Sequence, residues 1–182
     1  MENSYTLDAF GHIVDVTGDW DDFAQRNHAH DASGNQILGK KLWNFVSGAD
    51  TVSYLNAIFF FTRRTGKEFA MNCRCDGPNV ARLMKMRVIP GANSLLMVKH
   101  QLLACGPHKF DPELSAMRHR FATARCSMCA KIEVGGEWID PFAKISDQDA
   151  SIDHKVCPEC RRKTRVALGI DTVKQDPHAR RA

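Results

Sequence analysis

The chain lacks any long apolar run. Its longest one, Ala57–Phe61, is far shorter than the roughly 20 apolar residues that a helix needs to cross a bilayer. The first residues, Met1–Ser4, are polar and lack the basic and apolar segments of a secretion signal. We therefore expect a cytoplasmic protein that has no contact with a membrane.

Catalytic signatures are also missing. No nucleophile, base and orienting group occur at a recognisable spacing, and no glycine-rich phosphate loop is present. A chain of 182 residues also leaves no room for a histidine-kinase or cyclase domain beside the elements predicted below. We therefore expect a protein that is not an enzyme and that acts through a signalling partner.

The charge does not indicate nucleic-acid binding by itself. A composition of 43% hydrophobic and 25% charged residues is that of an ordinary globular protein with a real core. The formal net charge of +4 divides into +1 for residues 1–104 and +3 for residues 105–182. Four thiolates around one Zn²⁺ would add about −2 to the second part, so the positive excess there is small.

The cysteines indicate a metal site. Seven cysteines without a secretion signal favour metal binding over disulfides, because the cytosol keeps thiols reduced. Cys126, Cys129, Cys157 and Cys160 form two Cys-x-x-Cys pairs, and two such turns complete a tetrahedral shell around one cation. We predict one structural Zn²⁺. Iron in the same shell, a redox pair and two unrelated pairs remain alternatives.

The first part of the chain has the pattern of an α+β domain. The predicted elements are strands at 4–8 and 12–16, a helix at 20–27, the longest helix at 51–65, and strands at 68–75, 80–89 and 94–103. Asp50 is predicted to be the N-cap of the longest helix, which Gly66 ends. Phe59, Phe60 and Phe61 cannot all face the core, because helical neighbours lie about 100° apart.

This order of elements resembles the PAS sensor domain. Small matches support the resemblance: Leu7-Asp8…Gly11…Ile13, Gly39-Lys40…Leu42-Trp43 and Thr65-Gly66-Lys67. The resemblance covers roughly residues 4–104 and implies a five-stranded antiparallel sheet with helices over one face. It also implies that the domain senses a small ligand or a partner, and that it forms a homodimer, for which we expect Phe59–Phe61 to be the interface. An unrelated α+β domain is the alternative.

A ligand pocket is predicted between the sheet and the longest helix, because flexible methionines and aromatic rings there would form a deformable apolar lining. The candidate lining residues are Trp43, Phe45, Phe59, Met71, Met84 and Met86. A filled core that serves only protein contacts is the alternative.

Neither haem nor flavin is favoured as the ligand, which stays unidentified. PAS domains that bind haem take an axial histidine from the long helix, and residues 50–66 contain none. Asn72-Cys73-Arg74 resembles the core of flavin-binding photosensor domains, but it follows the long helix and lies on a predicted strand.

The remaining chain is predicted to form a linker and a metal module. Cys105-Gly106-Pro107 breaks the last strand, and Asp111-Pro112-Glu113 begins a helix that we expect to reach Arg125. A hairpin (131–133 and 137–139) and a further helix would separate the two cysteine pairs. The predicted parts are a PAS-like domain at 1–104, a linker helix at 105–125, a four-cysteine zinc-binding domain at 126–170 and a flexible tail at 171–182.

The cysteine-containing part resembles a treble-clef or ribbon-like zinc module often attached to PAS, GAF and response-regulator domains in bacterial signalling proteins. The matches are Cys126-x-x-Cys129-x-Lys131, Gly136-x-Trp138, and His154 before Cys157-Pro158-Glu159-Cys160. A glycine commonly follows that histidine in the family, whereas here Lys155 does. The resemblance implies a module that relays the state of the sensor domain to another protein.

A zinc-dependent nucleic-acid-binding transcriptional regulator is the rival prediction. The cations of the run Arg161–Arg165 could contact phosphates, which would make binding fall steeply with salt. No aromatic residues interleave this run, and such a run is more often a solvated helix face, so nucleic acid is not favoured. A redox or metal sensor that releases zinc when its cysteines are oxidised is a third alternative.

Overall fold

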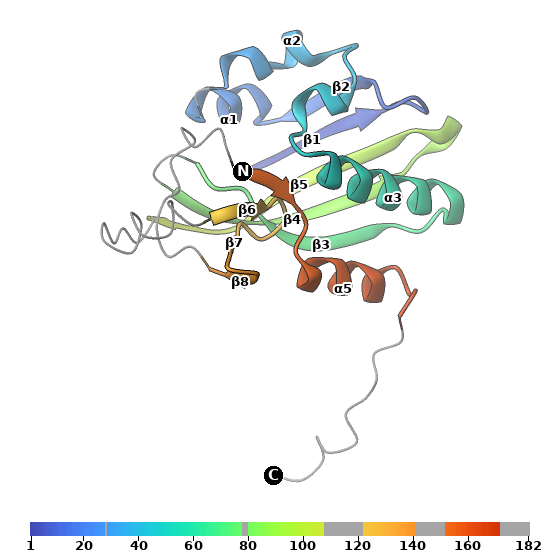
Figure 1. The fold of residues 1–182 in the computed structure, drawn as a ribbon. Helices are drawn as coiled ribbons and strands as arrows, with labels where there is room; N and C mark the ends of the chain where they lie inside the picture. The colour runs from blue at the N-terminus through green and yellow to red at the C-terminus, as the bar shows by residue number, and fades with distance from the viewer. Residues whose placement is uncertain (28, 78–79, 108–121, 141–151, 172–182) are drawn as a thin grey trace, which may run out of the picture.

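The first half of the chain folds into a five-stranded antiparallel sheet with helices over one face (Figure 1). The computed structural model describes residues 1–27, 29–77, 80–107, 122–140 and 152–171. The strands are β1 Glu2–Leu7, β2 Ile13–Gly18, β3 Phe69–Arg74, β4 Val80–Pro90 and β5 Leu96–Pro107, in the spatial order β2-β1-β5-β4-β3. This confirms the predicted α+β class and the predicted five-stranded antiparallel sheet. None of the helices in the described ranges is both long and apolar enough to span a bilayer.

One face of the sheet is buried beneath the helices, and the other faces water. In β4, Met84, Met86 and Val88 are buried, whereas the intervening Leu83 and Lys85 are exposed. This alternation is that of an antiparallel sheet covered on one side. The helices are α1 Trp20–Arg26, η1 His30–Ala32, α2 Gly34–Ile37, η2 Leu42–Phe45 and α3 Ala49–Thr65, and a further short 3₁₀ turn is η3 Ala92–Ser94.

The longest helix, α3, differs from its prediction at its start. Its N-cap is Gly48 rather than Asp50, and Asp50 lies inside the first turn. The carboxylate of Asp50 instead accepts a hydrogen bond from the backbone N–H of Val156, 2.8 Å away, and so contacts the C-terminal half. Gly66 ends the helix in the left-handed conformation, as predicted.

The cysteine-containing half forms a second, smaller sheet and one helix. Its strands are β6 Ala122–Cys126, β7 Ile132–Val134, β8 Glu137–Ile139 and β9 Asp153–Lys155, in the order β8-β7-β6-β9, followed by α5 Pro158–Ala167. The β7–β8 hairpin confirms the one predicted across Gly135-Gly136. β9 pairs with β6 in parallel, although these two strands are far apart in the sequence.

The prediction of a linker helix at 105–125 is wrong for residues 105–107 and 122–125, which lie in strands. β5 continues to Pro107, which pairs with Val80, and residues 122–126 form β6. Pairing with β7 on one side and β9 on the other satisfies the backbone of β6, and this outweighs its local helical pattern. The rest of that helix, at 108–121, lies outside the described residues, as do 141–151, between the cysteine pairs, and the predicted tail from 172 onward.

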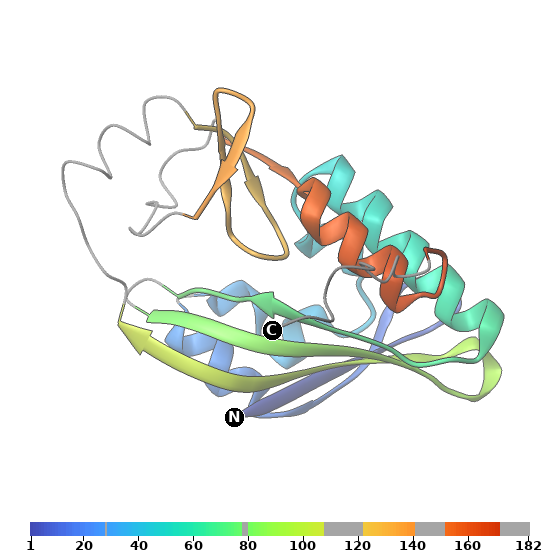
Figure 2. The same cartoon turned by 90° about the horizontal axis from the view of Figure 1, so that it is seen from below.

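The two halves share one hydrophobic core. Cys126, Met128, Val156 and Cys157 belong to the same buried cluster as the inward-facing residues of the first sheet. Helices α3 and α5 lie side by side (Figure 2), and the hydroxyl groups of Tyr54 and Thr164 form a hydrogen bond between them. The sequence pattern predicted two domains in series and gave no indication of this packing.

Candidate metal centre

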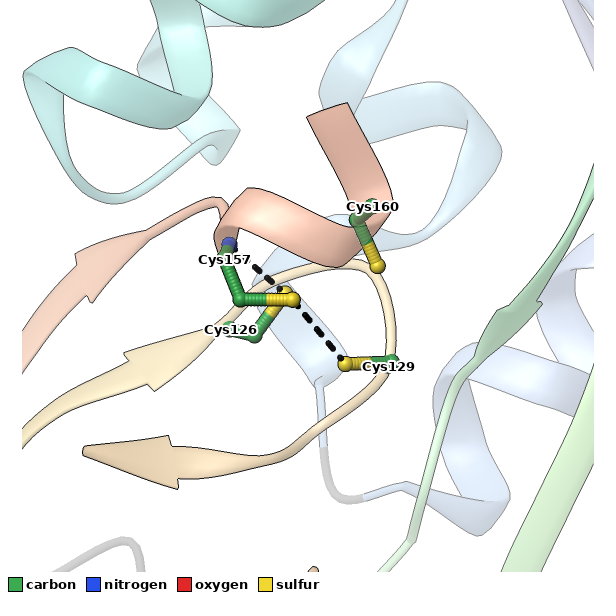
Figure 3. A group of neighbouring side chains, drawn as sticks. All are labelled: Cys126, Cys129, Cys157 and Cys160. Carbon is green, nitrogen blue, oxygen red and sulfur yellow. Dashed lines mark hydrogen bonds between the residues drawn. The ribbon is translucent and has the colours of Figure 1, made fainter. Parts of the chain in front are cut away.

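Four cysteine side chains converge between the end of β6 and the start of α5 (Figure 3). Cys126 ends β6, Cys129 lies in the turn that follows, Cys157 is the N-cap of α5 and Cys160 lies in its first turn. Their sulfur atoms all lie within 4.8 Å of one another. The structure therefore brings together the four residues that the sequence predicts as metal ligands.

Local backbone chemistry explains why each pair presents two sulfurs to one point. In the first pair, the Cys126 N–H donates to the carbonyl of Lys131 at 2.7 Å, and Ala130 adopts a positive φ of 61°. This tight turn reverses the chain around the sulfurs. In the second pair, Pro158 occupies the first turn of α5, where its missing N–H costs no hydrogen bond. The helix then places Cys160 about one turn beyond Cys157.

The spacing of the sulfurs fits a tetrahedral metal ion. Zinc–sulfur bonds of about 2.3 Å imply sulfur–sulfur edges of about 3.8 Å in a tetrahedron. The sulfurs of Cys129 and Cys157 are 3.7 Å apart. The backbone N–H of Cys157 also points to the sulfur of Cys126 at 3.4 Å, which stabilises negative charge there. A cluster of four soft thiolates at these distances can bind a metal ion such as zinc.

Electrostatics within the cluster favour one thiolate over the others. The pKa of Cys126 is far below its usual range, because the thiols of Cys129 and Cys160 and the N–H of Cys157 donate hydrogen bonds to its sulfur. The same hydrogen bond raises the pKa of Cys129 to about 12, and the pKa of Cys160 is raised strongly for the same reason. A metal ion must therefore displace protons from the remaining thiols, which makes binding weaker in acid.

The loops that carry the cysteines are hydrogen-bonded to the first half of the protein. The backbone N–H of Arg74, at the end of β3, donates to the carbonyl of Met128 at 2.7 Å. The hydroxyl groups of Thr51 and Ser127 are 2.7 Å apart. Together with the Asp50–Val156 bond, these contacts connect both cysteine loops to α3 and β3.

His154 is not part of the cysteine cluster, and its backbone instead contacts the first half of the protein. In the part of the chain that the structure describes, the cluster consists of cysteines alone. His154 lies on β9, and its backbone carbonyl is 3.4 Å from the hydroxyl of Thr51. Lys155, which replaces the glycine common in the resembling modules, pairs with Cys126 in the parallel β6–β9 register.

A small cavity of about 120 Å³ lies between α1 and the first sheet. Of the six residues predicted to line a pocket, Met84 lines this cavity. Its aromatic walls, Tyr5, Trp20, Phe23 and His100, were not predicted from the sequence. Burial lowers the pKa of His100 to about 4, so this side chain is neutral at pH 7. The inward direction of Tyr5 and His100 follows from the β1–β5 register, which the sequence alone does not specify.

The other five predicted pocket residues lie elsewhere. Trp43 and Phe59 stack on each other with ring centroids 5.9 Å apart, and Met86 is buried in the core. Met71 lies half-buried where β3 meets α5, and Phe45 lines a second cavity between the two halves. The structure therefore distributes the six residues over the core and two cavities.

The sheet and the cysteine cluster together define an α+β protein with a five-stranded antiparallel sheet and a candidate four-cysteine metal centre. The chain is similar to a domain of an HTR-like protein from Haloarcula marismortui, with 14% identity and a TM-score of 0.39 over 57% of this chain and 98% of that one. It is also similar to the PAS domain of the quorum-sensing receptor RpfR from Cronobacter turicensis, solved in complex with C12:0, with 16% identity and a TM-score of 0.41 over 57% and 94% of the two chains. No protein-family model and no curated protein matches the chain.

Proposed function

We propose that this is a non-enzymatic bacterial signalling protein of the cytoplasm, in which the PAS-like half senses a small ligand or a partner and the four-cysteine module relays the change to another protein. The cluster would hold one structural Zn²⁺, since four thiolates leave no open position for catalysis. The observation that carries the proposal is the set of hydrogen bonds joining the cysteine loops to α3 and β3. A shift in the sensor sheet would thereby move the metal module.

The relay is placed at this direct contact, instead of in the helix predicted at 111–125. Asp50 accepts from Val156, next to Cys157, while Arg74 donates to Met128, between the two cysteines of the first pair. The backbone of each cysteine loop is therefore hydrogen-bonded to the sensor half. The ligand would be a small apolar or aromatic molecule, in keeping with the uncharged walls of the cavity beside Tyr5 and His100.

Hydrogen–deuterium exchange of the full chain, with metal bound and after chelation, tests the relay. Removal of the metal is expected to lower the protection of amides in α3 and β3, because their contacts with the cysteine loops depend on the metal-bound geometry. Strands β1 and β2, which lie at the far edge of the sheet, serve as the internal control and should keep their protection. A change confined to residues 122–171 would mean that the two halves do not communicate.

Within the predicted homodimer interface Phe59–Phe61, Phe60 is the most exposed residue and Phe61 is partly exposed. Phe59 is 2% exposed and belongs to the core, whereas Phe60 is 69% exposed on α3. Replacing Phe60 with serine is expected to halve the mass measured by light scattering, because an exposed ring of this size is a strong contact in an interface. Phe10→Ser, which changes a 78% exposed ring in the β1–β2 turn, is the matched control. Equal masses for both variants and the unmodified protein would remove Phe60 from the interface.

The ion pairs of α5 favour a protein partner over nucleic acid. Arg161 pairs with Asp50 of the other half. Lys163 pairs with Glu159 at 2.8 Å, a carboxylate that it shares with Lys131, and Arg165 pairs with Asp171 at 2.7 Å. These carboxylates already pair with three of the four cations that a nucleic acid would contact, which weakens the rival prediction of a transcriptional regulator.

A further inference from the structure

The second cavity, of about 320 Å³, is bounded by both halves of the protein. Its walls include Phe45, Thr51, Arg74 and Asp76 from the sensor half, and Arg125, Ser127 and His154 from the metal module. Its volume lies at the lower end of the range of about 300–1,000 Å³ that is typical of small-molecule sites. Unlike the cavity beside α1, this one is lined by charged and hydroxyl groups, which suit a polar ligand.

One of the two arginines in this cavity is already neutralised. Arg74 donates from Nε and Nη2 to the two carboxylate oxygens of Asp76, at 2.9 and 2.6 Å. Arg74 also forms an ion pair with Asp140 at 3.8 Å. The backbone N–H of Arg82 donates a hydrogen bond to Asp76 at 3.0 Å. The Asp76 side chain, only 6% exposed, is therefore fully engaged by this bidentate pair.

The second arginine, Arg125, has no comparable acceptor. Its guanidinium forms a looser ion pair with the same carboxylate, 3.9 Å from Asp76, and makes no hydrogen bond to any residue in the described ranges, although its side chain is only 25% exposed. A guanidinium carries five N–H donors, and one ion pair at 3.9 Å leaves most of them without an acceptor in the described ranges. The hydroxyl groups of Thr51 and Ser127 also line this cavity, and because they are hydrogen-bonded to each other, at most one of their two protons is left for a ligand.

We infer that this cavity binds a small anion bearing a carboxylate or phosphate group, with Arg125 as its principal contact. An oxyanion of this kind supplies the planar or tetrahedral set of acceptors that a guanidinium fork matches best. The anion would touch Arg125 and Ser127 on the metal module and Thr51 on the sensor half. Its occupancy therefore stabilises the docked arrangement of the two halves, which makes it a second input to the relay proposed above.

Calorimetric titration of the metal-loaded full chain with inorganic phosphate, at constant ionic strength set by sodium chloride, tests this site. Saturable binding is expected for the unmodified protein, and Arg125→Gln should weaken it by about ten-fold or more, the loss typical of hydrogen bonds to a charged group. Arg162→Gln removes the same charge from an exposed position on α5 and should bind phosphate like the unmodified protein.

Arg125→Lys keeps the charge but loses the fork, so it should bind phosphate with intermediate affinity, which provides a second measurement if the glutamine variant loses its metal. The inference is overturned if phosphate gives no saturable heat beyond that of chloride, or if the Arg125 variants bind like Arg162→Gln. The effect of the anion on signalling rests on the proposed relay, whereas anion binding itself does not. Binding is measured here directly, whereas the relay is tested by hydrogen exchange, so either can fail alone.

Discussion

Replacing Cys160 with serine is expected to abolish metal binding and to unfold the cysteine-containing half. Cys160 is 4% exposed and supplies one of the four sulfurs, and a serine hydroxyl remains protonated and is a poor ligand for a soft cation. Structural Zn²⁺ contributes about 10–16 kcal/mol of apparent binding free energy in small zinc domains, so losing it removes most of the stability of the module. Metal content after dialysis against a chelator should fall from about one ion per chain to about zero.

The matched control is Cys105→Ser, which changes an exposed cysteine outside the cluster and should leave the metal in place. Elemental analysis also separates zinc from iron, the alternative that the same shell would hold. Because Cys126, Cys157 and Cys160 belong to the shared core, the Cys160 variant should also lower the melting temperature of the sensor half. A folded, unmodified protein that carries no metal would overturn the assignment of the cluster.

Replacing Gly48 with alanine is expected to separate the metal module from the sensor half. Gly48 has a φ of 85°, and a Cβ atom there would lie 2.1 Å from the backbone oxygen of His154 on β9. A contact below 3.0 Å with backbone forces one of the two segments to move. The displacement would break the bonds that Asp50 and Thr51 make with the segment from His154 to Val156.

The control for the backbone penalty is Gly39→Ala. Gly39 has a similar φ of 76°, but its Cβ would meet nothing within 4 Å. Both variants carry a backbone cost of about 1–3 kcal/mol, so the difference between their unfolding free energies measures the clash with β9. We expect Gly48→Ala to be clearly the less stable and to be cleaved faster by protease within residues 122–171. Equal stability and equal cleavage would mean that the contact at His154 does not hold the halves together.

Cys160→Ser and Gly48→Ala separate the effect of the metal from the effect of the contact between the halves. The cysteine variant removes the metal and leaves the docking surface of α3 unchanged. The glycine variant leaves all four sulfurs in place and disturbs only the surface between the halves. If Gly48→Ala retains its metal but exchanges amides in α3 faster, the metal module is stable without docking, and the relay depends on the contact itself.

The hydrophobic patterns and cysteine spacing were sufficient to predict most of the elements. Alternation in β3, β4 and β5 identified three strands, and the β7–β8 hairpin followed from the two glycines between its strands. The errors arose where tertiary pairing overrides a local pattern. Residues 122–125 were predicted to end a helix, yet β7 and β9 approach them from both sides and supply backbone partners that a helix would not use.

Asp50 is a second case in which a tertiary contact overrides a local pattern, here for a side chain. An acid before an apolar helix is a good N-cap by local criteria, but Gly48 takes that position and Asp50 bonds to Val156 and Arg161. The partner lies more than one hundred positions further along the chain, and no local pattern encodes such a separation. The pocket prediction met a related limit, since which methionines line a cavity depends on how α1 and α3 pack on the sheet.

The sequence by itself determined the α+β class, the antiparallel strands and the four cysteines that form the candidate metal centre, because alternation of burial and the Cys-x-x-Cys turn are local physical constraints. Only the tertiary structure decided that the cysteine-containing half packs against α3 and β3 and shares the core of the first half. Only it placed Arg125, with no hydrogen-bond acceptor in the described ranges, in a cavity between the two halves. Such features depend on contacts between distant segments, which form only when burial of apolar surface brings those segments together.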